Sequence, residues 1–213
     1  MMRNLKALML AAVAVLSLSA VAASAAQAAE FHSSVASTTL KTTTDGTAKN
    51  AHQVFDAAGA SITCPGVEIV SGAIAGTTVP SVTVKVKYTG TCTFVGQTAT
   101  VEMRGCDYRF NASGTVDLVG ANCAAEPIQF SVPSPPCTVT VGPQSGLSSV
   151  KYNNIKPGTK SEITLEPTVT GITYTATGSG CPETGTKSNG NYTTGNVIVT
   201  GEASGSMVDI SWE

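Results

Sequence analysis

The chain has 213 residues, a formal net charge of −2, and only 12% charged residues, about half the fraction usual in a globular domain. The sequence contains no basic run or stripe, which excludes a nucleic-acid interface of the usual electrostatic kind and a nucleic-acid partner with it. The length suits a single domain with a sizeable hydrophobic core.

Residues 1–28 have the pattern of a secretory signal peptide. Arg3 and Lys6 supply a positive start, an apolar stretch follows, and small residues lead up to Ala28, which is the order found in exported precursors. The apolar stretch has about 14 residues, whereas a helix that spans a bilayer needs roughly 20. We therefore predict cleavage near Ala28, with Ala25 as the competing position and an uncleaved membrane anchor as the alternative. The mature protein is then secreted or associated with the cell envelope, and no transmembrane segment remains in it.

Residues 29–213 predict a single all-β domain, because apolar and polar residues alternate with a period of two. The clearest run is Ser81 to Tyr88, in which one face carries Val82, Val84, Val86 and Tyr88 and the other carries Thr83, Lys85 and Lys87. A strand of this kind buries one face and exposes the other, as in antiparallel sheets. Similar short runs occur at 53–55, 61–64, 67–74, 98–103, 106–110, 115–119, 128–132, 138–141, 149–152, 162–165, 172–177, 196–200 and 207–212.

Turn-forming residues separate these runs, at 58–59, 111–114, 133–136, 156–158, 178–180 and 188–190. Many short strands with a turn every 8–12 residues predict an antiparallel β-sandwich, either Ig-like or jelly-roll-like. Whether the chain forms one sandwich or two small subdomains stays open at this point. Residues 29–48 are rich in Ser and Thr, and form either an edge strand or a loose N-terminal arm.

The six cysteines all follow the predicted signal peptide. They are Cys64, Cys92, Cys106, Cys123, Cys137 and Cys181, separated by 28, 14, 17, 14 and 44 residues. An even number of cysteines in an exported chain indicates disulfides. A zinc site is the alternative, but zinc ligands favour close pairs that this spacing lacks. Nearest-neighbour pairing is the simplest arrangement: Cys64–Cys92, Cys106–Cys123 and Cys137–Cys181. The middle pair is the best supported, because its members flank a predicted hairpin.

No catalytic residue is predicted. Nucleophilic hydrolysis needs a base beside the nucleophile, and the only histidines are His32 and His52, neither of which has a recognisable partner. Glycoside hydrolysis needs two carboxylates across a cleft. Glu102 and Asp107 flank a cysteine on strand-like segments, where outward-facing sheet positions are the simpler interpretation. Metal-binding and phosphate-binding motifs are missing from the sequence, so we predict no metal and no cofactor.

Aromatic residues bear on glycan binding, which often uses exposed rings on a sheet face. Trp212 is the only tryptophan, and its alternating segment suits a closing strand that seals the edge of the sheet, since large aromatic side chains are usually buried. Tyr152, Tyr174 and Tyr192 either stack on sugars or pack in the core.

Three segments carry a resemblance to a known group of proteins. They are Arg104–Phe110, Gly142–Val150 and Val169–Tyr174, which look like segments of uncharacterised secreted, β-rich, disulfide-containing proteins of high-GC Gram-positive bacteria. The resemblance implies an exported β-protein and supplies no catalytic residue to carry over.

These features lead to three functional hypotheses. The first is a secreted, non-enzymatic β-sandwich that acts by surface contact with an extracellular protein or glycan, as an interaction or structural component. The second is a carbohydrate- or ligand-binding module. The third is an extracellular hydrolase that uses a carboxylate pair.

Overall fold

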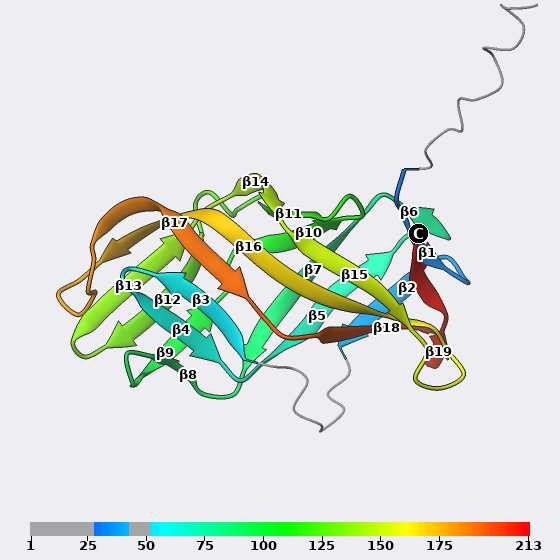
Figure 1. The fold of residues 1–213 in the computed structure, drawn as a ribbon, viewed down its shortest axis with the longest axis horizontal. Helices are drawn as coiled ribbons and strands as arrows, with labels where there is room; N and C mark the ends of the chain where they lie inside the picture. The colour runs from blue at the N-terminus through cyan, green and yellow to red at the C-terminus, as the bar shows by residue number, and fades with distance from the viewer. Residues whose placement is uncertain (1–27, 43–51) are drawn as a thin grey trace, which may run out of the picture.

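The computed structural model describes residues 28–42 and 52–213 (Figure 1). Within these ranges every regular element is a β-strand and every strand pairing is antiparallel, which confirms the all-β, antiparallel prediction. No helix in the described part of the chain is long and apolar enough to cross a membrane. The predicted signal peptide lies, apart from Ala28, outside the described residues.

Eight strands close on themselves as a barrel. The ring runs β2–β5–β7–β10–β11–β14/β15–β16–β18 and returns to β2. The strands β14 and β15 follow each other directly and act as one member of the ring. The barrel strands are β2 (Thr38–Thr42), β5 (Gly66–Ile74), β7 (Ser81–Thr89), β10 (Asp107–Asn111), β11 (Thr115–Val119), β14 (Gln144–Ser148), β15 (Val150–Ile155), β16 (Glu162–Thr177) and β18 (Val197–Ala203).

A second ring of strands lies end to end with the barrel. It runs β3–β4–β8–β9–β12–β13–β16–β17 and returns to β3. Its strands, besides β16, are β3 (Gln53–Ala57), β4 (Ala60–Cys64), β8 (Cys92–Phe94), β9 (Gln97–Glu102), β12 (Ile128–Pro133), β13 (Pro136–Val141) and β17 (Gly185–Thr193). We call this set the second ring.

The long strand β16 belongs to both rings, as its diagonal course in Figure 1 shows. Its first part, Glu162 to Pro167, pairs with β15 and β18 of the barrel, and its later part pairs with β13 and β17 of the second ring. The register shifts between Val169 and Ile172, where Gly171 takes a φ of +74° that suits glycine. The two runs that the sequence predicts at 162–165 and 172–177 are therefore one strand, and this strand joins the two rings.

The chain crosses repeatedly between the rings, and two disulfides tie these crossings together. Cys64 ends β4 before the chain enters the barrel, and Cys92 begins β8 after it has left. Cys106 and Cys123 lie at the next pair of crossings, before β10 and after β11. The two crossing segments are in close backbone contact there. A Cβ atom added to Gly120 would lie 2.2 Å from the carbonyl oxygen of Gly105, so only glycine fits at this position.

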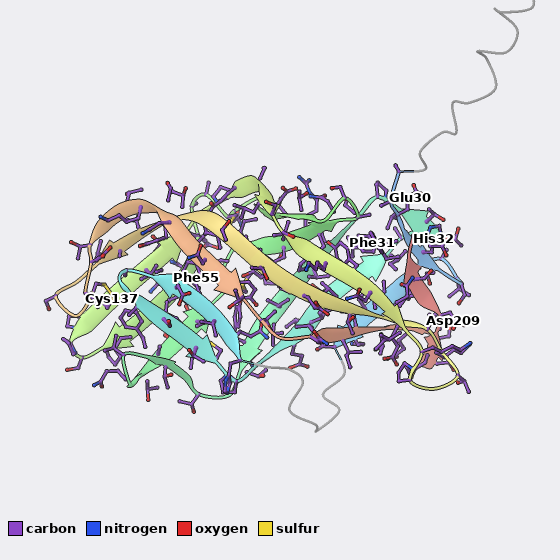
Figure 2. The ribbon with its side chains drawn as sticks, in the orientation of Figure 1. Glu30, Phe31, His32, Phe55, Cys137 and Asp209 are labelled. Atoms are coloured by element: carbon purple, nitrogen blue, oxygen red, sulfur yellow. A yellow bond between two sulfur atoms is a disulfide. The ribbon has the colours of Figure 1, made fainter. Side chains whose placement is uncertain are left out.

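The third disulfide, Cys137–Cys181, closes the far end of the second ring, where Figure 2 labels Cys137. The three bridges are the pairs that nearest-neighbour pairing predicts, and the described residues contain no free cysteine. In the chain-entropy model, the loops of 28, 17 and 44 residues correspond to about 3–4 kcal/mol each.

A three-stranded sheet covers the other end of the barrel. It consists of β20 (Ile210–Trp212), β1 (Phe31–Ser33) and β6 (Thr78–Val79), with β1 in the middle. We call it the cap. The hairpin between β18 and β19 (Ser206–Val208) leads the chain into β20. Within the cap, Trp212 packs at 5.7 Å from the ring of Tyr152 and donates from its Nε1 to the carbonyl of Ala112.

Three expectations change with this architecture. A closed barrel with extra strands replaces the Ig-like or jelly-roll-like sandwich, because each barrel strand has a neighbour on both edges. The segment 188–190 is part of β17 and not a turn. Gly190 pairs with Ile172 of β16, and its missing side chain lets the two strands come close together beside Tyr174. The segment 29–48 contributes the paired strands β1 and β2, while 43–48 lies outside the described residues. The turns at 58–59, 111–114, 133–136 and 156–158 do connect strands as predicted.

Candidate functional site

The barrel encloses a cavity of about 130 Å³. The alternation of β7 supplies one wall, because Val82, Val84, Val86 and Tyr88 are all buried and all line the cavity, while Thr83 and Lys87 on the other face are exposed. The opposite wall comes from aliphatic side chains of β11, β16 and β18. The sequence pattern thus places the apolar faces of the strands around a common interior.

Side chains from outside the barrel line both ends of the cavity. Phe31 and Ile210 of the cap cover one end, and Phe55 and Phe130 of the second ring lie at the other. Figure 2 shows Phe31 and Phe55 at these two positions along the length of the molecule. Phe55 and Phe130 stack with ring centroids 5.0 Å apart, which gives that end a firm aromatic floor.

A chain of hydroxyl groups interrupts this apolar lining. The hydroxyls of Tyr88 and Tyr108 lie 2.8 Å apart, and the phenol of Tyr192 lies near enough to influence the pKa of Tyr88. Tyr192 donates to the Oε1 of Gln53, and the Nε2 of Gln53 donates to Thr194 at 2.6 Å. All five residues line the cavity, so its wall has one polar site in otherwise hydrocarbon surroundings.

Burial is the main influence on these phenols. It raises the pKa of Tyr88, Tyr108 and Tyr192 above the ordinary value of 10, since the phenolate would be formed away from water. The pKa of Tyr152, whose hydroxyl donates to the carbonyl of Asn111 at 3.0 Å, is raised for the same reason. The cluster is therefore neutral throughout the physiological range and acts as a set of hydrogen-bonding groups, not as an acid or base.

The cavity has the size of a small organic molecule. An engineered apolar cavity of about 150 Å³ stays dry and binds benzene, so about 130 Å³ suits a ligand of one aromatic ring. Among the described residues no Lys, Arg or His lines the cavity, and Asp117 is the only described carboxylate there. The arrangement can hold a small, neutral, mostly apolar ligand.

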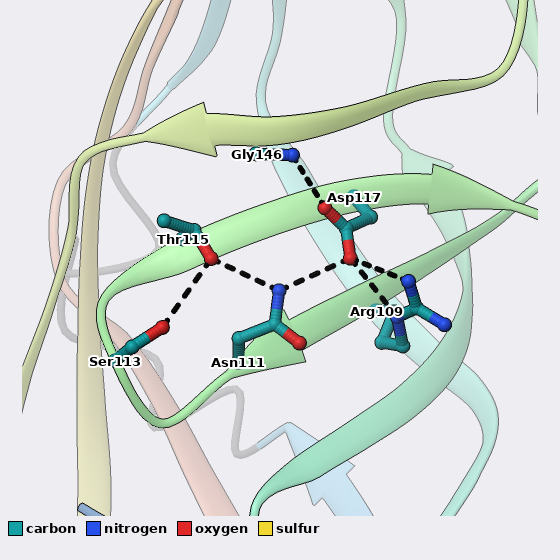
Figure 3. Close-up of polar contacts among 6 residues, drawn as sticks. All are labelled: Arg109, Asn111, Ser113, Thr115, Asp117 and Gly146. Atoms are coloured by element: carbon teal, nitrogen blue, oxygen red, sulfur yellow. Dashed lines mark hydrogen bonds and ion pairs between the residues drawn. The ribbon is translucent and has the colours of Figure 1, made fainter.

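Asp117 of β11 is held by a network that ties together the neighbouring barrel strands β10, β11 and β14 (Figure 3). Its Oδ2 accepts from the guanidinium of Arg109, at 2.7 and 3.0 Å, and from the amide of Asn111 at 3.1 Å, while its Oδ1 accepts from the backbone N–H of Gly146 at 2.6 Å. Burial by itself raises the pKa of Asp117, but these four hydrogen bonds outweigh it and leave the pKa below its ordinary value. The network is a structural clamp, because all its donors converge on one satisfied carboxylate.

The structure does not bring the candidate acid–base residues together. His32 lies in the cap, with its Nδ1 3.3 Å from the Thr78 hydroxyl and its Nε2 4.0 Å from Glu213, whereas His52 is exposed just before β3. Glu102 is exposed on β9 of the second ring, and Asp107 is half-buried on β10 of the barrel. The Oδ1 of Asp107 is buried and has no hydrogen-bond partner among the described residues.

The aromatic candidates for sugar stacking pack inside the molecule. Tyr152 and Tyr174 are buried, while Tyr192 and Trp212 are half-buried and pack against the core. No group of three or more His, Cys, Asp and Glu in the described ranges is arranged to hold a metal ion.

Sequence reasoning missed the polar site in the cavity. One signal was present, because Gln53 alternates in phase with Phe55 and Ala57 and so faces the interior with them. The meeting of Tyr88 and Tyr108 has no local signal, since it depends on the pairing of β7 with β10.

Searches of family models, of curated proteins and of solved structures find no match to this chain. The resemblance to secreted proteins of high-GC Gram-positive bacteria therefore stays a prediction.

Proposed function

We propose that the protein is an exported, non-enzymatic binding protein that takes one small, neutral, mostly apolar molecule into its barrel. The observation that carries this proposal is the cavity of about 130 Å³ between the cap and the second ring. Export is supported by the pattern of residues 1–28 and by the three disulfides, which form and persist in oxidising compartments.

An empty volume of this size is costly to a folded protein. At about 24 cal/mol for each Å³ of residual cavity, 130 Å³ corresponds to about 3 kcal/mol of lost packing free energy. This is a large part of the 5–15 kcal/mol that typically stabilises a domain. A ligand that fills the volume recovers this packing, which gives binding a favourable free energy without any charged contact.

The other two hypotheses have less support. A surface-contact protein usually exposes a contiguous apolar patch. In the described part of the chain the large exposed apolar residues are Val70 on β5, Met207 on β19, Val35 between β1 and β2, and Val95 between β8 and β9. The carboxylate pair considered for a hydrolase is divided between the two rings. The cavity supports the binding hypothesis over these two.

The test is ligand-induced stabilisation of the mature protein purified from culture medium. Benzene, toluene, phenol and indole serve as probes, with thermal unfolding and methyl NMR as the measurements. A probe present at about 100 times its Kd should stabilise the fold by about 2.7 kcal/mol, which for a domain of this size raises Tm by about 5–10 °C.

Two variants locate the bound probe. Val86→Phe places an aromatic ring in the cavity and should abolish the stabilisation. Val139→Ile alters the interior of the second ring and should leave it unchanged. If no probe raises Tm or shifts the methyl signals of cavity residues, the proposal is wrong.

A further inference from the structure

The wall of the barrel is interrupted where β14 lies against β16 (Figure 1). The ladder between β15 and β16 is followed by two backbone hydrogen bonds between Ser149 and Thr168. Beyond them, no strand pairing joins the described residues 144–148 to 169–173. We call these two facing stretches the seam. Five extended residues on each side give the seam a length of roughly 16 Å.

A single side chain bridges the seam at the end remote from Ser149. The Nε2 of Gln144 donates to the carbonyl oxygen of Thr173, and the N–H of Thr173 donates to the Oε1 of Gln144, both at 2.8 Å. The amide takes the place of a neighbouring strand, because it presents a donor and an acceptor side by side. We call these two hydrogen bonds the clasp. Rotation of the side chain releases both of them without any change in the backbone of β14.

The other edges of the two strands show which way the seam opens. β14 pairs with β11 along its opposite edge, and the N–H of Gly146 donates to Asp117. In β16, the register with β17 shifts on both sides of Ile172, and Gly171 takes a φ of +74°. Irregularities of this kind bend a strand and weaken its ladder locally. Opening therefore separates β16 from β14, while β14 stays on β11.

The seam borders directly on the cavity. Gln144 and Leu147 of β14 and Val169 and Ile172 of β16 all line it. Gln144 and Leu147 are also half-exposed, so these side chains reach from the cavity to the surface. One layer of side chains separates the interior from solvent at this place.

The cap is the other route into the barrel, and it has a clasp of the same kind. The side-chain amide of Asn154 donates to the carbonyl of Trp212 and accepts from its N–H, both at 2.8 Å. However, β20 also pairs with β1, the N–H of Ile210 donates to Ser161, and the indole of Trp212 donates to Ala112. Release of one clasp leaves these other bonds in place.

We propose that the ligand enters and leaves the cavity through the seam, and that the clasp between Gln144 and Thr173 is the gate. This inference rests on the proposed function, because it concerns access to the same cavity. The ligand passes an open gate in both directions, so the clasp governs association and dissociation together. Loss of a contact inside the closed cavity acts mainly on dissociation, which distinguishes a gate from an ordinary contact.

The experiment measures the exchange of toluene between its free and bound states by NMR on the mature protein. Gln144→Ala removes the clasp and should raise the association and dissociation rates about tenfold each, because two hydrogen bonds no longer oppose opening. The matched control is Asn154→Ala, which removes the equivalent clasp at the cap. Its rates should stay within about twofold of those of the unmodified protein.

Hydrogen exchange on the unmodified protein tests the gate without a substitution. The N–H of Thr168 is held by the backbone of Ser149, and the N–H of Thr173 is held by the side chain of Gln144. If the clasp opens locally, Thr173 should be protected at least about tenfold less than Thr168. This comparison decides the question even if Gln144→Ala does not fold.

The outcomes separate this inference from the proposed function. If toluene binds but Gln144→Ala leaves both rates unchanged, or if Asn154→Ala speeds exchange more than Gln144→Ala does, the seam is not the entrance and the cavity remains a ligand site. Equal protection of Thr168 and Thr173 also overturns the gate. If neither toluene nor the other probes bind, both proposals fall.

Discussion

The barrel and the second ring contain the same number of strands and share β16, yet their interiors differ. The barrel encloses about 130 Å³, whereas a gap lined by side chains inside the second ring measures about 10 Å³, close to the smallest volume that holds one water molecule. Closure by eight strands therefore does not by itself leave a hollow interior.

The difference comes from the side chains that face inward. In the second ring, the ring of Phe55 packs against those of Phe130 and Tyr174, and Phe94 is buried and lines the small gap together with Phe130. In the barrel, the inward positions of β5, β7, β11 and β18 carry mainly valine, isoleucine and leucine, which reach less far. Residues of the cap and of the second ring line the two ends of this volume. The cavity therefore follows from the smaller side chains that face into the barrel, and not from the closed arrangement of strands that both rings share.

The largest expected effect concerns the bridges. Replacing Cys137 and Cys181 together by Ser releases a loop of 44 residues and should lower the free energy of unfolding by about 4 kcal/mol. The same change at Cys106 and Cys123 releases 17 residues and should cost about 3 kcal/mol. Urea unfolding of both variants measures the difference. A smaller loss for the 44-residue loop would show that loop entropy does not govern the second ring.

A matched pair of substitutions tests the packing of the two interiors directly. Val139→Ile adds one methylene group to the filled second ring, where Val139 is 1% exposed, and should destabilise the protein by about 1–3 kcal/mol. Val86→Ile adds the same group next to the cavity and should be neutral or stabilising by up to about 0.8 kcal/mol. Chemical unfolding measures both values. Equal destabilisation by the two changes would mean that the barrel is as tightly packed as the second ring.

Asp117 should make the stability of the barrel depend on acid pH. The pKa of Asp117 is lowered in the folded protein from an ordinary value of 3.8, so its stabilising contribution is present above pH 3.8 and is lost as the pH falls through the lower folded-state value. Asp117→Asn should therefore cost about 1–2 kcal/mol at pH 7 and flatten the loss of stability at acid pH. Urea unfolding from pH 7 down to pH 2 provides the measurement. If the free energy of unfolding of the variant falls as steeply at acid pH as that of the unmodified protein, Asp117 is not the group responsible.

The smallest expected effect appears at alkaline pH. The folded-state pKa values of Tyr88, Tyr108, Tyr152 and Tyr192 are raised, so their contribution is present below pH 10 and is lost as the pH rises beyond it. Absorbance at the phenolate band should show these four groups ionising only as the protein unfolds. Titration of any of these cavity phenols near pH 10 in the folded protein would show that water reaches the cavity.

The sequence by itself determined the local features of this protein. The alternation at 81–88 predicted which residues of β7 face inward, the turns at 111–114 and 133–136 predicted two hairpins, and the cysteine spacing predicted three bridges. The strand faces and the hairpins depend on residues that are close along the chain. The three bridges join each cysteine to the next one in the sequence, which is the simplest pairing. A period-two pattern reports that one face of a strand is buried, whatever the sheet does next.

Tertiary structure alone decided that the sheet closes, that β16 serves two rings, and that one ring is hollow. Closure depends on the registers between strands as distant in sequence as β2 and β18, and periodicity carries no information about such a register. The cavity is the volume left over when side chains from the barrel, the cap and the second ring have all been placed. Its polar site exists because two pairings, β7 with β10 and β3 with β17, bring Tyr88, Tyr108, Tyr192 and Gln53 to one point.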